Sequence, residues 1–280
     1  MADHGKNNRS KKPRPKQSGS AGNRDRRDDR KSGPRGDRGG YRGKGQDNDS
    51  RYRDNRGEKA QRTGLHLSEQ LGGDLPRWVR DEVQRVTSKD RREATLELLA
   101  SGAHAFAAGK YRQASPMLKE AKNLSPRTAT IRELLGLTLY RLGDWEDALR
   151  EMRTYRRLEG DTTHMAVEVD CLRALERPAD VRKTWKLYRS LGGRPNADAE
   201  MRVVYGAFLL DEGQPRDAWA IVKPGRLVKD AEEWILRQWF VAARVAIELG
   251  DGATARQLVK AIEARDAGFP GISELSDQIS

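Results

Sequence analysis

Apolar and charged residues follow helical spacing through residues 135–152, LGLTLYRLGDWEDALREM. An amphipathic α-helix places its apolar side chains three or four positions apart, and the leucines of this segment do so. Gly136 and Gly143 interrupt the pattern. Because a glycine inside a helix costs about 1 kcal/mol relative to alanine, two of them in one helical segment require a structural explanation.

The two glycines belong to a pattern that recurs along the chain. Residues 101–121 and 135–155 align with a uniform offset of 34. The aligned pairs are Gly102 with Gly136, Gly109 with Gly143, Tyr111 with Trp145, Ala114 with Ala148, and Leu118 with Met152. Further along the chain, the corresponding positions are Gly206, Gly213 and Ala218, and then Ala243, Gly250 and Ala255. A repeat of about 34 residues predicts a stacked array of helices.

Two different structural roles explain the two glycines. A residue just past a helix end favours a left-handed φ, which Gly143 adopts without a Cβ penalty. Asp144 then follows as the predicted N-cap of the next helix, and Gly250–Asp251 repeats the arrangement. Gly136 lies within its helix, where we expect it to face Ala148 so that two helix backbones can approach closely.

The repeating positions resemble those of the tetratricopeptide repeat, a helix–turn–helix unit. Repeat one, residues 95–128, matches the family at Leu98, Gly102, Gly109, Tyr111, Ala114, Leu118, Ala121 and Pro126. Repeat two, residues 129–162, matches at Gly136, Gly143, Trp145, Ala148 and Met152. Repeat two departs from the family at its end, where Tyr155 replaces a small residue and Gly160 replaces a proline.

The remaining repeats are less regular. Repeat four keeps Gly206, Leu209, Gly213, Ala218 and Val222, and repeat five keeps Ala243, Ala246, Gly250 and Ala255. Repeat three, at about 163–196, is degenerate, because Asp170 stands where Gly136 stands in repeat two. The resemblance implies an all-α, right-handed helical-repeat solenoid of four to five helix pairs over residues 95–265.

Segments on both sides of the repeats are predicted to cap them. Residues 64–94 read as a linker and an N-terminal capping helix, with the helix at 74–86, DLPRWVRDEVQRV. Within the array, residues 231–250 predict a long and strongly apolar helix. Residues 266–280 predict a C-terminal capping segment that is partly helical.

The resemblance also implies a peptide-binding groove. In such arrays the first helix of each pair lines a concave surface that takes a protein or peptide partner. The groove residues carried over are Leu99, Ala103 and Phe106 in repeat one, Glu133, Leu137 and Tyr140 in repeat two, Leu210 and Asp211 in repeat four, and Phe240 and Arg244 in repeat five. The alternative for Leu96 and Leu99 is that they pack against the capping helix.

Composition separates residues 1–63 from the rest of the chain. This segment carries 20 Lys and Arg against 9 Asp and Glu, a net charge of +11, whereas the whole chain carries +12. It contains no Leu, Ile, Val, Phe or Trp, so it cannot bury enough apolar surface to offset the entropy lost on ordering. We therefore predict that residues 1–63 are a disordered basic tail rich in Arg and Gly.

The tail has the residues of a flexible nucleic-acid-binding arm. Its segment 35–45, RGDRGGYRGKG, resembles an RGG/RG box, and such segments bind single-stranded RNA through charge and stacking. The predicted contacts are Lys6, Arg9, Lys11, Lys12, Arg14, Lys16, Arg35, Arg38, Tyr41 and Arg42. The alternative is a solubilising tail of mixed charge, because acidic residues dilute the positive charge after residue 24.

No catalytic or metal-binding pattern emerges from the sequence. The four histidines are scattered without a His or Cys partner at helical spacing, and the single cysteine, Cys171, excludes an internal disulfide. We therefore expect no catalytic residue, no cofactor, no metal and no small-molecule substrate. The longest apolar run, residues 203–210, is too short to span a membrane, and the N-terminus lacks a secretory apolar region, so we expect a cytoplasmic location.

Together these features predict a non-enzymatic adaptor. The repeats would bind a protein partner, and the tail would contact RNA or a ribonucleoprotein. The alternative is a protein scaffold whose tail only solubilises it, and an enzyme of unknown class is the third hypothesis. An array of this kind binds many kinds of partner, so the resemblance does not name the partner.

Overall fold

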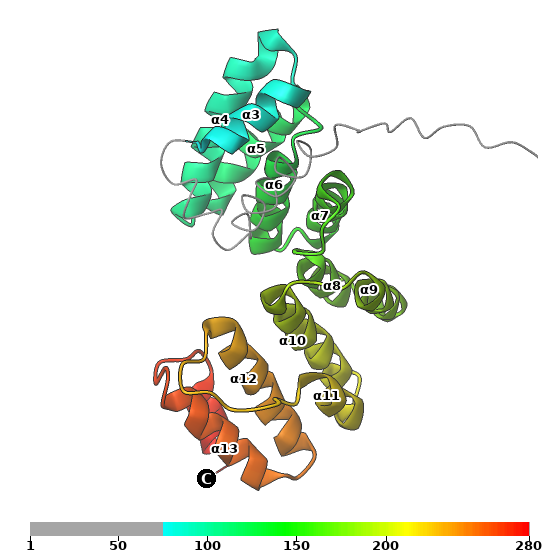
Figure 1. The fold of residues 1–280 in the computed structure, drawn as a ribbon, viewed down its shortest axis with the longest axis vertical. Helices are drawn as coiled ribbons and strands as arrows, with labels where there is room; N and C mark the ends of the chain where they lie inside the picture. The colour runs from blue at the N-terminus through cyan, green and yellow to red at the C-terminus, as the bar shows by residue number, and fades with distance from the viewer. Residues whose placement is uncertain (1–74, 280) are drawn as a thin grey trace, which may run out of the picture. The chain divides into compact units, whose positions relative to one another are not determined.

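The computed structural model describes residues 75–279, and the regular elements of this part of the chain are all helices (Figure 1). They form twelve α-helices and one short 3₁₀ helix, Lys89–Arg91, with no strand in this part of the chain. The α-helices are α3 Arg77–Val86, α4 Arg92–Ala107, α5 Tyr111–Leu124, α6 Ala129–Leu142, α7 Trp145–Glu159, α8 Met165–Ala174, α9 Pro178–Leu191, α10 Pro195–Asp211, α11 Pro215–Val222, α12 Glu233–Glu248, α13 Gly252–Glu263 and α14 Ile272–Asp277.

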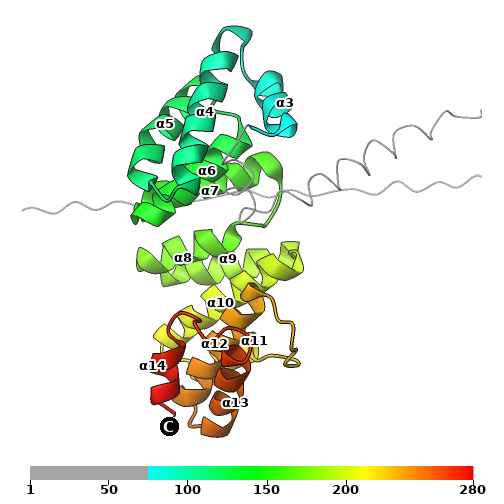
Figure 2. The same cartoon turned by 90° about the vertical axis from the view of Figure 1, so that its left-hand side faces the viewer.

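Consecutive helices pack against each other along the described chain. The most extensive contacts join α4 to α5, α6 to α7 and α12 to α13, and α10 packs likewise on α11. Contacts also skip one helix, because α10 touches both α8 and α12. Figure 2 shows α8 and α9 side by side, with α10 following them. Each helix therefore packs against its neighbours in the sequence, and α10 also connects α8 with α12.

The helical glycines allow close packing within the pairs, as the sequence predicts, but against a different neighbour. A Cβ built at Gly102 would lie 2.7 Å from Leu118 Cγ, which real Cβ atoms do not tolerate. A Cβ at Gly136 would overlap Met152, and one at Gly206 would overlap Val222. The side chain nearest to Gly136 is therefore that of Met152, whereas the sequence predicted Ala148 at this contact. The same contact between a glycine and a large apolar side chain recurs in three helix pairs.

The predicted turn after α6 is confirmed in its backbone and corrected in its cap. Gly143 has φ 79° in the left-handed region, as a C-terminal glycine should. Asp144 holds the N-cap position of α7, but its side chain makes no capping hydrogen bond. Asp251 does cap α13, because its Oδ1 accepts a 3.0 Å hydrogen bond from the amide of Thr254. The sequence signal of an Asp after Gly was therefore correct at only one of these two turns.

The degenerate third repeat forms a helix pair nonetheless. Helices α8 and α9 pack together, and the turn between them contains Glu176 at φ 53°. Glu176 is the only residue other than glycine with positive φ in the described chain. Its φ lies in the left-handed region, as does that of Gly143 between α6 and α7. The two turns are therefore similar, although a glutamate stands in one where a glycine stands in the other.

Buried polar groups connect the capping helix α3 to the repeats. Glu82 on α3 accepts a 2.5 Å hydrogen bond from the amide of Ala129 and a 2.6 Å bond from the Thr130 hydroxyl. Both donors lie in the first turn of α6, where backbone amides have no partner within the helix. Burial raises the pKa of the Glu82 carboxyl above its usual value, although the bonds from Thr130 and Ala129 oppose the shift. Glu82 therefore acts as a cap supplied from a distant helix.

At the other end, α12 matches the long apolar helix predicted at 231–250, and α14 lies within the predicted capping segment 266–280. The predicted tail, residues 1–63, and Asp74 lie outside the described residues. None of the described helices is both long enough and apolar enough to cross a membrane.

Candidate functional site

The first part of the predicted groove lies in the core. Leu99 and Ala103 are 0% exposed and Phe106 is 9% exposed. Phe106 packs edge-on against Tyr111, with ring centroids 5.4 Å apart. For Leu99, burial agrees with the packing alternative, since α3 covers α4. The surface that a partner could reach on the first helices therefore lies beyond these three residues.

Glu133, another predicted groove residue, is buried in a polar cluster. Its Oε1 lies 2.6 Å from His164 Nε2, and both side chains are less than 10% exposed. Burial raises the pKa of the Glu133 carboxyl, and the hydrogen bond and charge of His164 oppose that shift. The ring of Tyr155 packs edge-on against His164. This arrangement links α6 to the start of α8 and leaves Glu133 inaccessible to a protein partner.

The remaining predicted groove residues retain some exposure. Leu137, Tyr140, Leu210 and Phe240 are half-buried, while Asp211 and Arg244 are exposed. The Phe240 ring packs against Phe269 at 5.6 Å and against Gly271, so the C-terminal segment covers part of it. The predicted RNA contacts Lys6, Arg9, Lys11, Lys12, Arg14, Lys16, Arg35, Arg38, Tyr41 and Arg42 all lie outside the described residues. Tyr140 and Asp211 alone among the predicted groove residues lead to a larger polar assembly.

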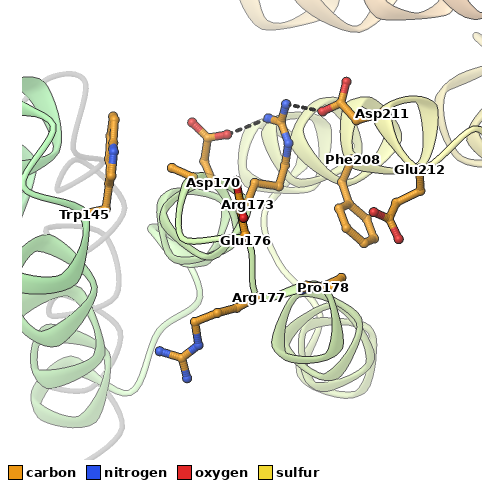
Figure 3. A pocket seen from close by; sticks show the side chains of 10 residues that line it. Trp145, Asp170, Arg173, Glu176, Arg177, Pro178, Phe208, Asp211 and Glu212 are labelled. Carbon is orange, nitrogen blue, oxygen red and sulfur yellow. Dashed lines mark hydrogen bonds and ion pairs between the residues drawn. The ribbon is translucent and has the colours of Figure 1, made fainter.

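A chain of hydrogen bonds joins α6, α8 and α10. The Tyr140 hydroxyl donates to Asp170 Oδ2 at 2.5 Å. Arg173 donates from Nη1 to Asp170 Oδ1 at 2.7 Å and from Nη2 to Asp211 Oδ2 at 2.6 Å (Figure 3). Burial and the Asp170 carboxylate both raise the pKa of Tyr140, so its hydroxyl stays protonated and acts as a donor. These side chains thus connect α6, α8 and α10, each of which is the first helix of its pair.

This chain borders the candidate site, a cavity of about 580 Å³. Its walls come from the start of α7, the end of α8, the α8–α9 turn and the end of α10. The lining residues are Trp145, Asp170, Arg173, Ala174, Glu176, Arg177, Pro178, Phe208, Asp211 and Glu212. In Figure 3 Trp145 stands on one side of the cavity, and Phe208 with Glu212 stands on the other.

The charged lining groups are extensively paired. Besides the two bonds of Arg173, Arg177 binds Asp180 through Nε at 2.8 Å and Nη2 at 2.6 Å. Arg182 binds Glu212 at 3.1 Å and lies 5.0 Å from the centre of the Phe208 ring. Pairing fixes the orientation of these side chains, because each bond restricts the rotamers of a long chain. With the exception of Glu176, the charged groups of the cavity wall are therefore held in place by pairing.

Aromatic packing supports the α7 side of the cavity. The Trp145 ring is half-buried and meets Tyr140 edge-on, with centroids 5.5 Å apart and planes inclined by 68°. Trp145 also lies beside Gly143, where a Cβ would be 3.6 Å from Trp145 Cζ2, an ordinary van der Waals contact. Part of the indole is exposed to the cavity, where an incoming group can contact it.

Sequence reasoning missed most of this site. Asp211 falls on a groove position of the resemblance, and Trp145 was noted only as a repeat position. Asp170, Arg173 and Glu176 all belong to the third repeat, where the alignment of glycines failed. The available signal was the run of charged residues from 170 to 177, but its meaning depends on contacts with residues 30 to 38 positions away.

Two features of the described residues bear on metal binding and on nucleophilic chemistry. No group of three or more His, Cys, Asp or Glu side chains between residues 75 and 279 could hold a metal ion. Cys171 is buried, and burial raises the pKa of its thiol to about 12, which disfavours the nucleophilic thiolate. What the cavity does offer is charge, an aromatic wall and a fixed shape, which are features of a binding site.

Comparison with known proteins adds no identification. A scan of protein-family models found none that matches the chain, and a search of curated proteins found no similar sequence. The fold and the cavity therefore define residues 75–279 only as a set of packed helices with a surface cavity.

Proposed function

We propose that this protein is a non-enzymatic adaptor that binds a protein partner at the cavity formed by α7, α8 and α10. The observation that carries the proposal is the hydrogen-bonded chain from Tyr140 through Asp170 and Arg173 to Asp211. It brings three successive first helices to one preorganised surface. Binding to such a surface loses little side-chain entropy, because its side chains are already fixed.

The proposal includes a tetratricopeptide-like solenoid with a right-handed array of helix pairs. Recurring contacts support it, since Gly102 meets Leu118, Gly136 meets Met152 and Gly206 meets Val222. In each pair the second residue follows the glycine by the same interval in the sequence. Arrays built this way bury a continuous core between neighbours and leave the first-helix surface for partners.

RNA or ribonucleoprotein contact through residues 1–63 forms the second part of the proposal. Its support is the sequence alone, in which this segment carries nearly all of the net charge of +12. An arginine-rich segment supplies phosphate contacts that the remainder of the chain, with a net charge of +1, lacks. The alternative proposal is a protein scaffold in which the same segment only keeps the chain soluble.

Site-specific photo-crosslinking tests the binding surface. A photoreactive residue replaces Glu176 in the cavity of the full-length protein, and a matched variant carries it at Glu263 on α13, which is equally exposed. The proposal predicts protein adducts that form from position 176 and not from position 263. Identical adduct patterns from both positions, or adducts from neither, would contradict the proposed surface.

A further inference from the structure

We propose that the cavity between α7, α8 and α10 binds a cationic side chain, an arginine or lysine from a basic segment of the partner protein. This inference rests on the proposed function, because it names the chemistry of the partner at the same surface. The charge balance of the cavity, its volume and its aromatic wall all favour such a ligand.

The lining of the cavity carries more negative than positive charge. Four carboxylates, from Asp170, Glu176, Asp211 and Glu212, face two guanidinium groups, from Arg173 and Arg177. Pairing with groups outside the lining leaves the balance unchanged, because Arg177 binds Asp180 and Arg182 binds Glu212.

Two carboxylates carry the excess of negative charge. Glu176 is exposed and forms no ion pair with the part of the chain that the structure describes. Asp211 shares Arg173 with Asp170 and uses only its Oδ2, so its Oδ1 is available, and its side chain is 51% exposed. A ligand cation can therefore reach both carboxylates from solvent without first breaking an ion pair.

Helix direction does not change this charge balance. Helix α8 ends at Ala174 and α10 ends at Asp211, but α7 begins at Trp145 and α9 begins at Pro178, and all four residues line the cavity. The C-terminus of a helix carries the negative end of its dipole and the N-terminus carries the positive end. Because the two kinds of helix end offset each other, the carboxylates decide the sign of the potential in the cavity.

The shape of the cavity suits a long cationic side chain. A volume of about 580 Å³ lies in the range of pockets that hold small ligands, about 300–1,000 Å³. The exposed part of Trp145 offers an indole face, on which guanidinium and ammonium groups bind through cation–π attraction. The same chemistry already operates within the chain, where Arg182 lies over the Phe208 ring and Arg173 is held between two carboxylates.

Other occupants fit the cavity less well. A phosphate or carboxylate would need free cations, but Arg173 and Arg177 are both neutralised by aspartates. A purely apolar group would contact mainly Ala174, Pro178 and Trp145. It would also remove water from several charged groups, and this desolvation costs free energy. A cationic side chain alone satisfies the carboxylates and the indole together.

Fluorescence anisotropy with a labelled nine-residue arginine peptide tests this inference. The full-length protein is titrated into the peptide at about 150 mM salt, where long-range attraction is largely screened beyond about 8 Å. We expect Glu176→Lys to weaken binding about fivefold to tenfold, because it turns one attractive surface pair into a repulsive one. The matched charge reversal Glu263→Lys on α13 should leave the affinity nearly unchanged.

A second variant removes a charge at another position of the cavity, so that the test does not rest on a substitution at Glu176 alone. Asp211→Asn retains the shape of the side chain and removes its charge, so we expect a loss of about twofold to fivefold. Circular dichroism confirms that each variant keeps the helical fold. Equal losses for Glu176→Lys and Glu263→Lys, or no binding of the arginine peptide, would each overturn the inference.

These outcomes are separable from those of the proposed function. If crosslinks still form specifically at position 176 while the arginine peptide fails to bind, the adaptor proposal stands and the cationic chemistry is wrong. If the peptide binds the cavity but no protein crosslinks there, the cation preference stands and the adaptor proposal fails.

Discussion

Buried carboxylates define this protein at the scale of single residues. Glu82 and Glu133 lie inside the described helices, and each is satisfied by hydrogen bonds rather than by a full ion pair with Lys or Arg. Burial of a carboxyl disfavours its charged form, so such groups oppose folding when they must ionise. They are retained here because they hold α3 to α6 and α6 to α8.

The first prediction concerns the pH dependence of stability at Glu82. Its folded pKa is raised above 4.5, so its contribution to stability is full below pH 4.5 and is lost as pH rises through the folded pKa. Glu82→Gln keeps an oxygen acceptor for the amide of Ala129 and cannot ionise. The free energy of unfolding of wild type should therefore fall relative to the variant as pH rises above 4.5.

Urea denaturation of both proteins between about pH 4 and 7 measures this difference. A gap between the two unfolding free energies that stays constant over the whole range would contradict the assignment of a raised pKa to Glu82. The measurement is independent of any binding partner.

A second prediction at the residue scale concerns the turn at Glu176. Its φ of 53° strains any residue with a Cβ, and glycine relieves that strain at some cost in backbone entropy. Glu176→Gly should raise the free energy of unfolding by about 0.5–1 kcal/mol while weakening arginine-peptide binding. A destabilised variant would show that the native glutamate stabilises the turn in a way that the structure does not reveal.

At the scale of helices, packing depends on close contacts at a few glycines. A methyl group at Gly136 would overlap Met152, and the side chains around it are fully buried. The helix gains about 1 kcal/mol of intrinsic propensity from alanine, so the outcome depends on which effect is larger. Overpacking of a tight core typically costs about 1–3 kcal/mol, so we expect this cost to exceed the gain in helix propensity.

The third prediction is therefore that Gly136→Ala lowers the free energy of unfolding by about 1–2 kcal/mol. Gly225→Ala serves as the control, because no atom lies within 4 Å of a Cβ at Gly225 and its φ is not positive. Thermal and urea unfolding measure both variants. A stabilised Gly136→Ala protein would mean that Met152 moves aside readily and that the contact is not needed.

The helical elements were largely predictable, because their signals are local. The apolar rhythm at 231–250 predicted α12, and the glycine at 143 predicted the end of α6. The turn at Glu176 was not predictable, since a glutamate gives no local sign of a positive φ. The burial of Leu99 agrees with the alternative that it packs against the capping helix. The burial of Glu133 was not predictable from its groove position, because it depends on His164, which lies 31 residues away in the sequence.

At the scale of the whole molecule, charge is divided unevenly along the chain. Residues 1–63 carry a net charge of +11, and the remainder carries +1. Within that nearly neutral remainder, the cavity carries an excess of negative charge. The adaptor hypothesis uses these two parts for two different partners, a protein and an RNA.

The fourth prediction concerns RNA. If residues 6–45 engage about five phosphates, the slope of log affinity against log salt should be near −3.5, from roughly −0.7 per phosphate on a single strand. Changing Arg35, Arg38 and Arg42 to Lys in the full-length protein keeps the charge and removes guanidinium stacking. The slope should hold while the affinity falls. No binding at about 50 mM salt would favour the solubilising alternative.

The central claim is that the chain binds a protein partner at the cavity between α7, α8 and α10. Affinity capture by nuclease-treated full-length protein, quantified by mass spectrometry, tests it most directly. Trp145→Leu combined with Glu176→Lys alters the cavity, and Trp234→Leu combined with Glu263→Lys makes the same changes elsewhere. We predict that a defined set of proteins is lost only from the cavity variant, with both variants folded. Equal capture by the two variants and wild type would contradict the claim.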